Sequence, residues 1–498
     1  MIHVRKSLAS NMPSFEVICH TIDLKQYEII DSYGVGDAAV FITKDGNYLV
    51  SEPKLSLEIH STYNQMMQQL FLSLEPLKSD DPVNYIEKHI WTEAQDQAIT
   101  DLVSKAFSQL RYYLVRDILG YGILDVLMKD ENIEEITCER FDNTIGVIHR
   151  KYTEFNILDT NIKFGTAESM NSYIQKIIQR TGGSVTAAFP IVNSMTTEGD
   201  RITVTYEKEV SLPGPTINIR KFTREPFTIA HLLEFGALDV LMVAYLWLLL
   251  DAKSFGLIVG ETGSGKTTII NALMTLINPR WKILTIEETP ELKIPHYRWE
   301  RLFTRTSPMI NQTENYDITM MDLIKASLRM RPDFEIVGEV RGQEAQFLFQ
   351  SAATGHGGLT TFHSSSPESA LNRLASEPIN VKTSQQMLLW FIAHMTRLKT
   401  RDKKTVRKIV SVKEVVPKTE GVELVEVFRY DQKTNSFGIS DIDDLIAKSR
   451  RIHTAADILN VDLRHDLQKR VSLLHECKSR NIKSLPEIIQ VFSKYYLE

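Results

Sequence analysis

"FGLIVGETGSGKTTIINALMTLI", residues 255–277, carries the pattern G-x-x-x-x-G-K-[ST] between an apolar strand-like run and an apolar helix-like run. Glycines let such a loop wrap with its backbone N–H groups pointing inward at phosphate oxygens. The N-terminus of the following helix adds a favourable potential for anions. We expect Lys266 to reach the β- and γ-phosphates of ATP and the Thr267 hydroxyl to bind Mg²⁺. The expected nucleotide-binding residues are Gly260, Glu261, Thr262, Gly263, Ser264, Gly265, Lys266, Thr267 and Thr268.

Two further stretches predict strands that end in carboxylates. "WKILTIEETPEL" (281–292) indicates a buried strand ending at Glu287 and Glu288, and "RPDFEIVGEVRGQEA" (331–345) indicates another ending at Glu339. Ligands in open α/β sheets bind at the carboxyl ends of the strands. We expect Glu287 or Glu288 to position the attacking water and Glu339 to hold Mg²⁺, through a water because no aspartate accompanies it. The alternative for the Glu287–Glu288 pair is a solvated acidic turn.

A histidine pair follows in "ATGHGGLTTFHS", residues 353–364. We expect a strand over 359–363 that brings His363 to the γ-phosphate or to a catalytic carboxylate, and a similar contact from His356 on the preceding loop. Core-capping roles for both histidines stay open. A zinc site is disfavoured because no cysteine is nearby.

Arginines near these motifs are candidate fingers that reach the nucleotide of an adjacent subunit, with solvated faces or surface ion pairs as the alternative. Within the strand-and-helix region they are Arg301, Arg305, Arg329, Arg331 and Arg341.

Composition limits the class of protein. The chain has 498 residues, 43% of them hydrophobic, and a net charge of −6, which predicts two or three globular domains and gives no overall attraction to nucleic acid. Cys19, Cys138 and Cys477 are too scattered for a disulfide framework or a Cys-x-x-Cys zinc site. The longest apolar run, 240–250, is well short of the roughly 20 residues that span a bilayer. The start of the chain lacks the apolar core of a signal peptide, so we expect a cytoplasmic protein.

The order of patterns predicts an α/β fold in several parts: an N-terminal extension with a β-hairpin (1–90), an α+β N-terminal domain (91–222) and a linker (223–230). A P-loop ATPase domain (231–440) and a helical C-terminal region (441–498) follow.

The motifs "GETGSGKTT", "TIEETPEL", "IVGEVRGQEA" and "TGHGGLTTFHS", in this order, resemble those of the type II/type IV secretion ATPase superfamily. "TPEL", "DLIKASLRMRPD" and "VRGQEA" are most similar to its archaeal branch, which includes motors of archaeal pili and of the archaellum. One departure is Glu287-Glu288, where Glu-Asp is common in the family.

This resemblance implies a RecA-like ATPase domain, a homo-hexamer, ATP and Mg²⁺, and peripheral attachment to the cytoplasmic face of the membrane. It implies a polytopic inner-membrane platform protein as partner, with pilin-like filament subunits served indirectly. By the same match, Arg201 and Arg220 stand where family arginines face the nucleotide or the next subunit. The function it implies is ATP-powered assembly of an archaeal type IV pilus-like filament, or protein secretion. The alternatives are an archaellum motor, a RecA-like nucleic-acid translocase and a nucleotide-binding scaffold with little turnover. No nucleic-acid partner is expected.

Overall fold

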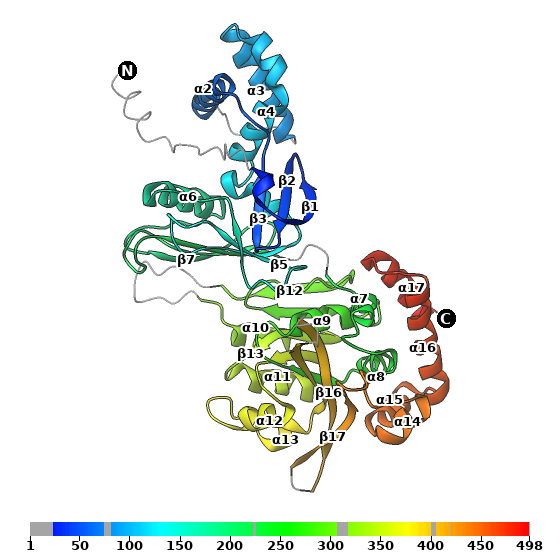
Figure 1. Cartoon of the computed structure of the whole chain (residues 1–498). Coiled ribbons are helices and arrows are strands. Elements are labelled where there is room, and N and C mark those ends of the chain that lie inside the picture. Colours follow the sequence, from blue (N-terminus) through cyan, green and yellow to red (C-terminus); the bar gives the residue numbers. More distant parts are fainter. Residues whose placement is uncertain are drawn as a thin grey trace. The chain divides into compact units, whose positions relative to one another are not determined.

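The computed structural model describes residues 23–73, 81–222, 226–305, 317–399, 405–419 and 421–497. The chain divides into two compact units, Met1–Arg224 and Glu225–Glu498 (Figure 1). The boundary falls inside the expected linker, whose residues 223–225 lie outside the described ranges.

The first unit is built on a nine-stranded sheet with the order β1-β2-β3-β6-β5-β4-β9-β8-β7. Its strands are β1 (Ile29–Val35), β2 (Ala38–Thr43), β3 (Asn47–Ser51), β4 (Ile133–Cys138), β5 (Gly146–His149), β6 (Leu158–Thr160), β7 (Ile191–Met195), β8 (Arg201–Thr205) and β9 (Thr216–Arg220). Its helices are η1 (Leu24–Gln26), α2 (Leu57–Ser73), α3 (Pro82–Asp96), α4 (Thr100–Ile118), η2 (Gly122–Leu124), α5 (Asp125–Lys129) and α6 (Ala167–Arg180). Helices α2, α3 and α4 pack together around a core of their own.

The structure joins the expected extension to the expected N-terminal domain. Strand β3 pairs in parallel with β6, and Asn47 lies opposite Asp159. Val40 and Tyr48 are buried in the same core as Val147. The boundary expected at residue 90 therefore does not separate two sheets, because the hairpin pattern fixes local pairing and says nothing about the next strand along.

The second unit is built on an eight-stranded sheet with the order β12-β11-β13-β14-β10-β15-β16-β17. The first six strands in this order are parallel, and the last two run antiparallel to their neighbours. The strands are β10 (Phe255–Val259), β11 (Ile283–Glu287), β12 (Trp299–Phe303), β13 (Phe334–Val340), β14 (Gly357–Phe362), β15 (Leu389–Lys399), β16 (Thr405–Pro417) and β17 (Val422–Arg429). The helices are α7 (Ile229–Glu234), α8 (Val240–Asp251), α9 (Lys266–Met274), α10 (Met320–Ser327), α11 (Glu344–Ala353), α12 (Pro367–Ala375), α13 (Thr383–Gln386), α14 (Ile442–Lys448), α15 (Arg451–Leu459), α16 (Leu463–Ser479) and α17 (Leu485–Leu497).

The apolar run at 240–250 forms α8, which is buried in the centre of this unit. Helices α15 and α16 pack against α8 (Figure 1). Trp247 donates a hydrogen bond to Tyr496 at 2.8 Å, and Arg470 pairs with Asp251 at 2.7 Å in the interior. The helical C-terminal region is therefore part of the same folded unit as the strands. No helix in the described ranges has the length and apolar character needed to cross a bilayer.

Candidate nucleotide-binding site

The loop between β10 and α9 has the backbone of a phosphate-binding loop. Gly263 and Gly265 have φ angles of 73° and 98°, which favour glycine. A Cβ on Gly260 would lie 2.2 Å from the carbonyl oxygen of Met395, so this position has no room for a side chain. The buried Ser264 hydroxyl has no hydrogen-bond partner in the described part of the chain. Thr267 and Thr268 lie in the first turn of α9.

Lys266 points back into this loop. Its Nζ donates to the carbonyl oxygens of Gly260 at 2.9 Å and Glu261 at 3.1 Å. Burial lowers the pKa of Lys266, and the nearby Glu339 carboxylate opposes that effect. A phosphate placed inside the loop would give the ammonium group stronger, charged acceptors than these carbonyls.

Two neighbouring strands deliver carboxylates to this edge of the sheet. Because β11 pairs in parallel with β13, Glu287 and Glu339 both lie at carboxyl ends. A Cβ on Gly338 would lie 3.4 Å from Glu287 Cγ, which places the Glu287 side chain against the end of β13.

Glu287 and Glu288 have different surroundings. Glu287 is 2% exposed, and its Oε1 accepts hydrogen bonds from the backbone N–H groups of Glu291 (2.8 Å) and Leu292 (2.9 Å). Its Oε2 has no partner among the described residues, and burial raises the pKa of the carboxyl group. The Glu288 side chain is 60% exposed.

Arg341 joins two of the expected catalytic carboxylates. Its guanidinium group lies 2.6 Å from Glu339 and 3.5 Å from Glu288. The hydrogen bond to Glu339 raises the pKa of Arg341. The structure therefore brings the carboxylates of Glu288 and Glu339 together around Arg341, and Glu339 also lies near Lys266 of the phosphate-binding loop.

The two histidines lie at opposite ends of β14. His363 follows its carboxyl end, and its Nε2 lies 3.2 Å from the Thr262 hydroxyl of the phosphate-binding loop. His356 precedes the amino end and hydrogen bonds through Nδ1 to Thr354 at 3.0 Å. The strand of six residues that lies between them is about 20 Å long at the usual rise.

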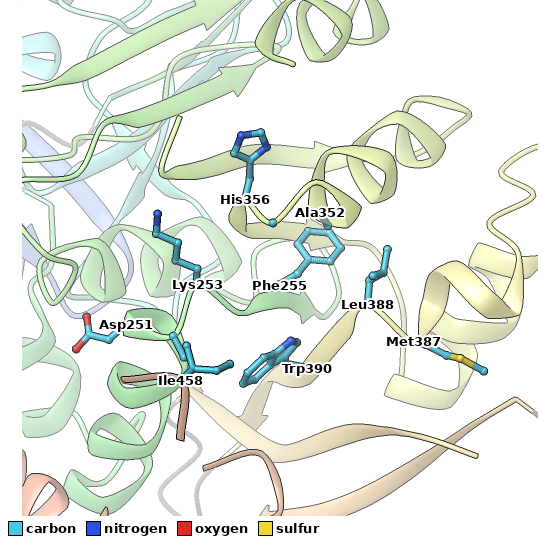
Figure 2. A pocket seen from close by; sticks show the side chains of 11 residues that line it. Asp251, Lys253, Phe255, Ala352, His356, Met387, Leu388, Trp390 and Ile458 are labelled. Carbon is cyan, nitrogen blue, oxygen red and sulfur yellow. The ribbon is translucent and has the colours of Figure 1, made fainter. Parts of the chain in front are cut away.

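The location of His356 corrects the expectation that both histidines face the phosphates. His356 lines a cavity of about 490 Å³ at the amino edge of the sheet, together with Lys253 and Trp390 (Figure 2). Residues at the starts of β10 and β15 line this cavity, whereas the phosphate-binding loop follows the end of β10. The cavity and the loop therefore lie at opposite ends of β10. The two histidines are close in sequence, but β14 lies between them and takes the chain from the amino edge of the sheet to the carboxyl edge.

The candidate arginines are widely distributed. On β12, Arg301 stacks over the Trp299 ring at 4.4 Å and donates to the carbonyl oxygen of Leu292 at 3.2 Å. Arg305 follows the carboxyl end of β12, where its backbone pairs with Ile318. Arg329 and Arg331 precede β13, which puts them at the amino edge, away from the loop of their own chain. Arg201 and Arg220 belong to the first unit, whereas the phosphate-binding loop belongs to the second.

Sequence reasoning missed two arginines beside the loop. Arg407 on β16 donates from Nε to the carbonyl oxygen of Gly263 at 2.9 Å, and Arg397 lies opposite it on β15. No motif marks these positions. Their location depends on β15 pairing with β10 and on β16 pairing with β15, and the sequence does not show either pairing.

The parallel sheet order, the loop after β10 and the carboxylates after β11 and β13 define a RecA-like P-loop domain, which an α+β unit precedes. The model of the Type II/IV secretion system protein family matches residues 126–479, and the chain belongs to that family.

Individual relatives cover different shares of the chain. An uncharacterised protein of Methanocaldococcus jannaschii is 33% identical over 399 residues, which are 77% of this chain and 69% of that protein. The type IV secretion system protein VirB11 of Brucella suis is 35% identical over 179 residues, 36% of this chain and 47% of that protein. Among solved structures, the Legionella pneumophila ATPase DotB gives a TM-score of 0.42 at 16% identity, over 74% of this chain and 94% of that one.

Proposed function

We propose that this protein is an ATPase that hydrolyses ATP to ADP and phosphate and couples the reaction to domain motion. The observation that carries the proposal is the phosphate-binding loop with Lys266, next to strand ends that bear Glu287 and Glu339. These are the parts that phosphoryl transfer to water needs: a cradle for phosphates, a cation and a carboxylate that orients the nucleophile.

In the proposed reaction the loop N–H groups hold the phosphates, and Lys266 exchanges its loop carbonyls for phosphate oxygens. Glu287 or Glu288 accepts a proton from the attacking water while the water oxygen bonds to the γ-phosphorus. The bond between the γ-phosphorus and the oxygen that bridges to the β-phosphate breaks, and ADP leaves with that oxygen. His363, fixed beside Thr262, is in position to contact the γ-phosphate.

The oxygen donors at this edge suit Mg²⁺, which prefers oxygen ligands and keeps several waters. The Thr267 hydroxyl would bind it directly and Glu339 through a water. The unpartnered oxygen of Glu287 is a further acceptor for such a water. Bound Mg²⁺ would neutralise charge that develops on the phosphate oxygens.

We further propose a homo-hexamer at the cytoplasmic face of the membrane that drives assembly of a type IV pilus-like filament, or secretion, through a polytopic platform protein. Family membership supports a role in such machinery, and the archaeal relative supports the archaeal setting. Arg201 and Arg220, and Arg305 at the carboxyl edge, are the arginines we propose to reach a neighbouring subunit's nucleotide.

ATP turnover with Mg²⁺ tests the proposal. We expect Lys266→Ala and Glu339→Gln each to lower turnover by roughly 100-fold or more. Lys266→Ala removes a cation from the phosphates, and Glu339→Gln weakens the binding of the Mg²⁺ that would neutralise them. Lys433→Ala, an exposed lysine in a turn, is the matched control and should keep full turnover. Light scattering on the same samples reports the oligomeric state. Turnover that persists in Lys266→Ala would contradict the assignment of this site.

A further inference from the structure

The sheet order gives the nucleotide site two different sides. Strand β10, which carries the phosphate-binding loop, lies between β14 and β15. On the β14 side are His363 and, one strand further, Glu339. On the β15 side are Arg397 and Arg407, which lie directly opposite each other on β15 and β16.

Both arginines approach the tip of the loop. Arg407 donates from Nε to Gly263 at 2.9 Å, and a Cβ on Gly265 would lie 3.5 Å from Arg407 Cδ. A Cβ on Gly263 would lie 3.8 Å from an Nη of Arg397. Both side chains belong to exposed residues, and within the described ranges neither forms an ion pair. Two guanidinium groups thus stand next to the N-terminus of α9.

The polarity of the bound nucleotide follows from the carboxylates, and this step rests on the proposed function. Water must attack the γ-phosphate where Glu287, Glu288 and Glu339 lie, so the triphosphate points towards the β14 and β13 side. The α-phosphate and the nucleoside then extend from the loop towards β15 and β16.

We propose that Arg397 and Arg407 form the nucleoside end of the site, with the guanidinium N–H groups donating to the α-phosphate and a planar face stacking on the base. Guanidinium groups pair with phosphate oxygens in a fork geometry and stack on aromatic faces, which suits this combined role. The single bond from Arg407 to Gly263 leaves its other N–H groups for the nucleotide.

Binding of two probes to the full-length protein separates the nucleoside end from the phosphate end. Calorimetric titration with ADP reports the contacts to the nucleoside and to the phosphates, whereas inorganic tripolyphosphate lacks the ribose and base and reports phosphate contacts alone. We expect Arg397→Gln and Arg407→Gln each to weaken ADP binding by on the order of tenfold, because each removes a charge-assisted or stacking contact. The loss of tripolyphosphate affinity should be several-fold smaller than the loss of ADP affinity. Arg429→Gln, an exposed arginine on β17, is the matched control.

The outcomes differ for the two proposals. Equal weakening of both probes by Arg397→Gln and Arg407→Gln would overturn the nucleoside role and leave these arginines as supports of the loop. No change in ADP affinity in either variant would also overturn it. Failure of the unmodified protein to bind ADP and tripolyphosphate at all would instead overturn the proposed function. Arg397→Gln is the decisive variant because Arg397 makes no hydrogen bond to the loop in the described structure.

Discussion

Glu287 and Glu288 are neighbours in sequence but have different chemical roles available to them. One oxygen of Glu287 holds the backbone at Glu291 and Leu292, and the other is buried without a partner among the described residues. Burial raises the pKa of Glu287, which is the direction that makes a carboxylate a stronger general base. Glu288 is exposed beside Arg341. For the proposed hydrolysis we infer that Glu287 orients the water, a distinction that two adjacent glutamates in a sequence do not reveal.

Conservative substitutions test this distinction. In Glu287→Gln the amide oxygen still accepts the two backbone N–H groups, while the charge is lost. We expect turnover to fall by about 100-fold or more with nucleotide affinity nearly kept, since a catalytic base contributes roughly 10²–10⁴. Glu288→Gln is the adjacent control and should lose less than about tenfold. The reverse ranking, measured as kcat and as ADP affinity, would assign the role to Glu288.

At the scale of elements, a buried polar network ties the N-terminal hairpin to the first unit's sheet. The hydroxyls of Tyr33 on β1 and Tyr48 on β3 each donate to Asp130 at 2.7 Å. His149 at the end of β5 accepts the N–H of Lys151 on Nδ1, so its Nε2 carries the proton and donates to Tyr33 at 3.1 Å. This network requires the neutral imidazole.

The pH dependence of stability follows from that requirement. Burial lowers the pKa of His149 below its ordinary value of 6.5. As pH falls through about 6.5 the unfolded chain binds a proton that the folded chain does not, so the contribution is complete above that pH and is lost towards the lower, folded pKa. We expect the first unit's melting temperature to fall more between pH 7.5 and 5.5 in the unmodified protein than in His149→Gln. His465→Gln, at an exposed position on α16, should follow the unmodified protein. Parallel curves for all three proteins would show that His149 is not the responsible group.

The elements also show what local patterns predict. Apolar runs that end at glycine or charged residues predict strands at 255–259 and 334–337 and a helix after the phosphate-binding loop. The structure contains all three elements. Long-range pairing does not follow from such patterns. The parallel contact of β3 with β6, the packing of α16 on α8 and the approach of Arg407 to Gly263 each depend on which elements become neighbours. The predicted contact of His356 with the phosphates was wrong for a related reason: the whole length of β14 separates His356 from His363.

At the scale of the whole molecule, two arginines of the first unit face each other across neighbouring strands, as Arg397 and Arg407 do in the second unit. Arg201 on β8 and Arg220 on β9 lie directly opposite each other, and Glu135 on β4 is the other neighbour of Arg220. Like charges that lie directly opposite each other on neighbouring strands are unfavourable, and the Glu135 carboxylate next to Arg220 opposes this effect. The alternating burial of these strands puts both arginines on the face away from the core. These two guanidinium groups are the ones that we propose to reach the phosphates of a nucleotide bound to a neighbouring chain.

Mixing two inactive variants tests whether Arg220 acts on a neighbouring chain. Arg220→Ala should keep nucleotide binding but lose turnover by roughly 10³-fold, the lower range for a trans arginine. Lys266→Ala keeps Arg220 but has a defective loop. In mixed oligomers, an Arg220→Ala loop can meet an intact Arg220 from a Lys266→Ala neighbour, so turnover of an equal mixture should rise far above that of either variant alone. A second mixture of Lys266→Ala with Glu339→Gln, whose defects both lie around the loop, provides the control and should stay inactive. Turnover in the first mixture equal to the mean of its components, in samples that light scattering shows to be mixed oligomers, would mean that Arg220 serves only its own chain.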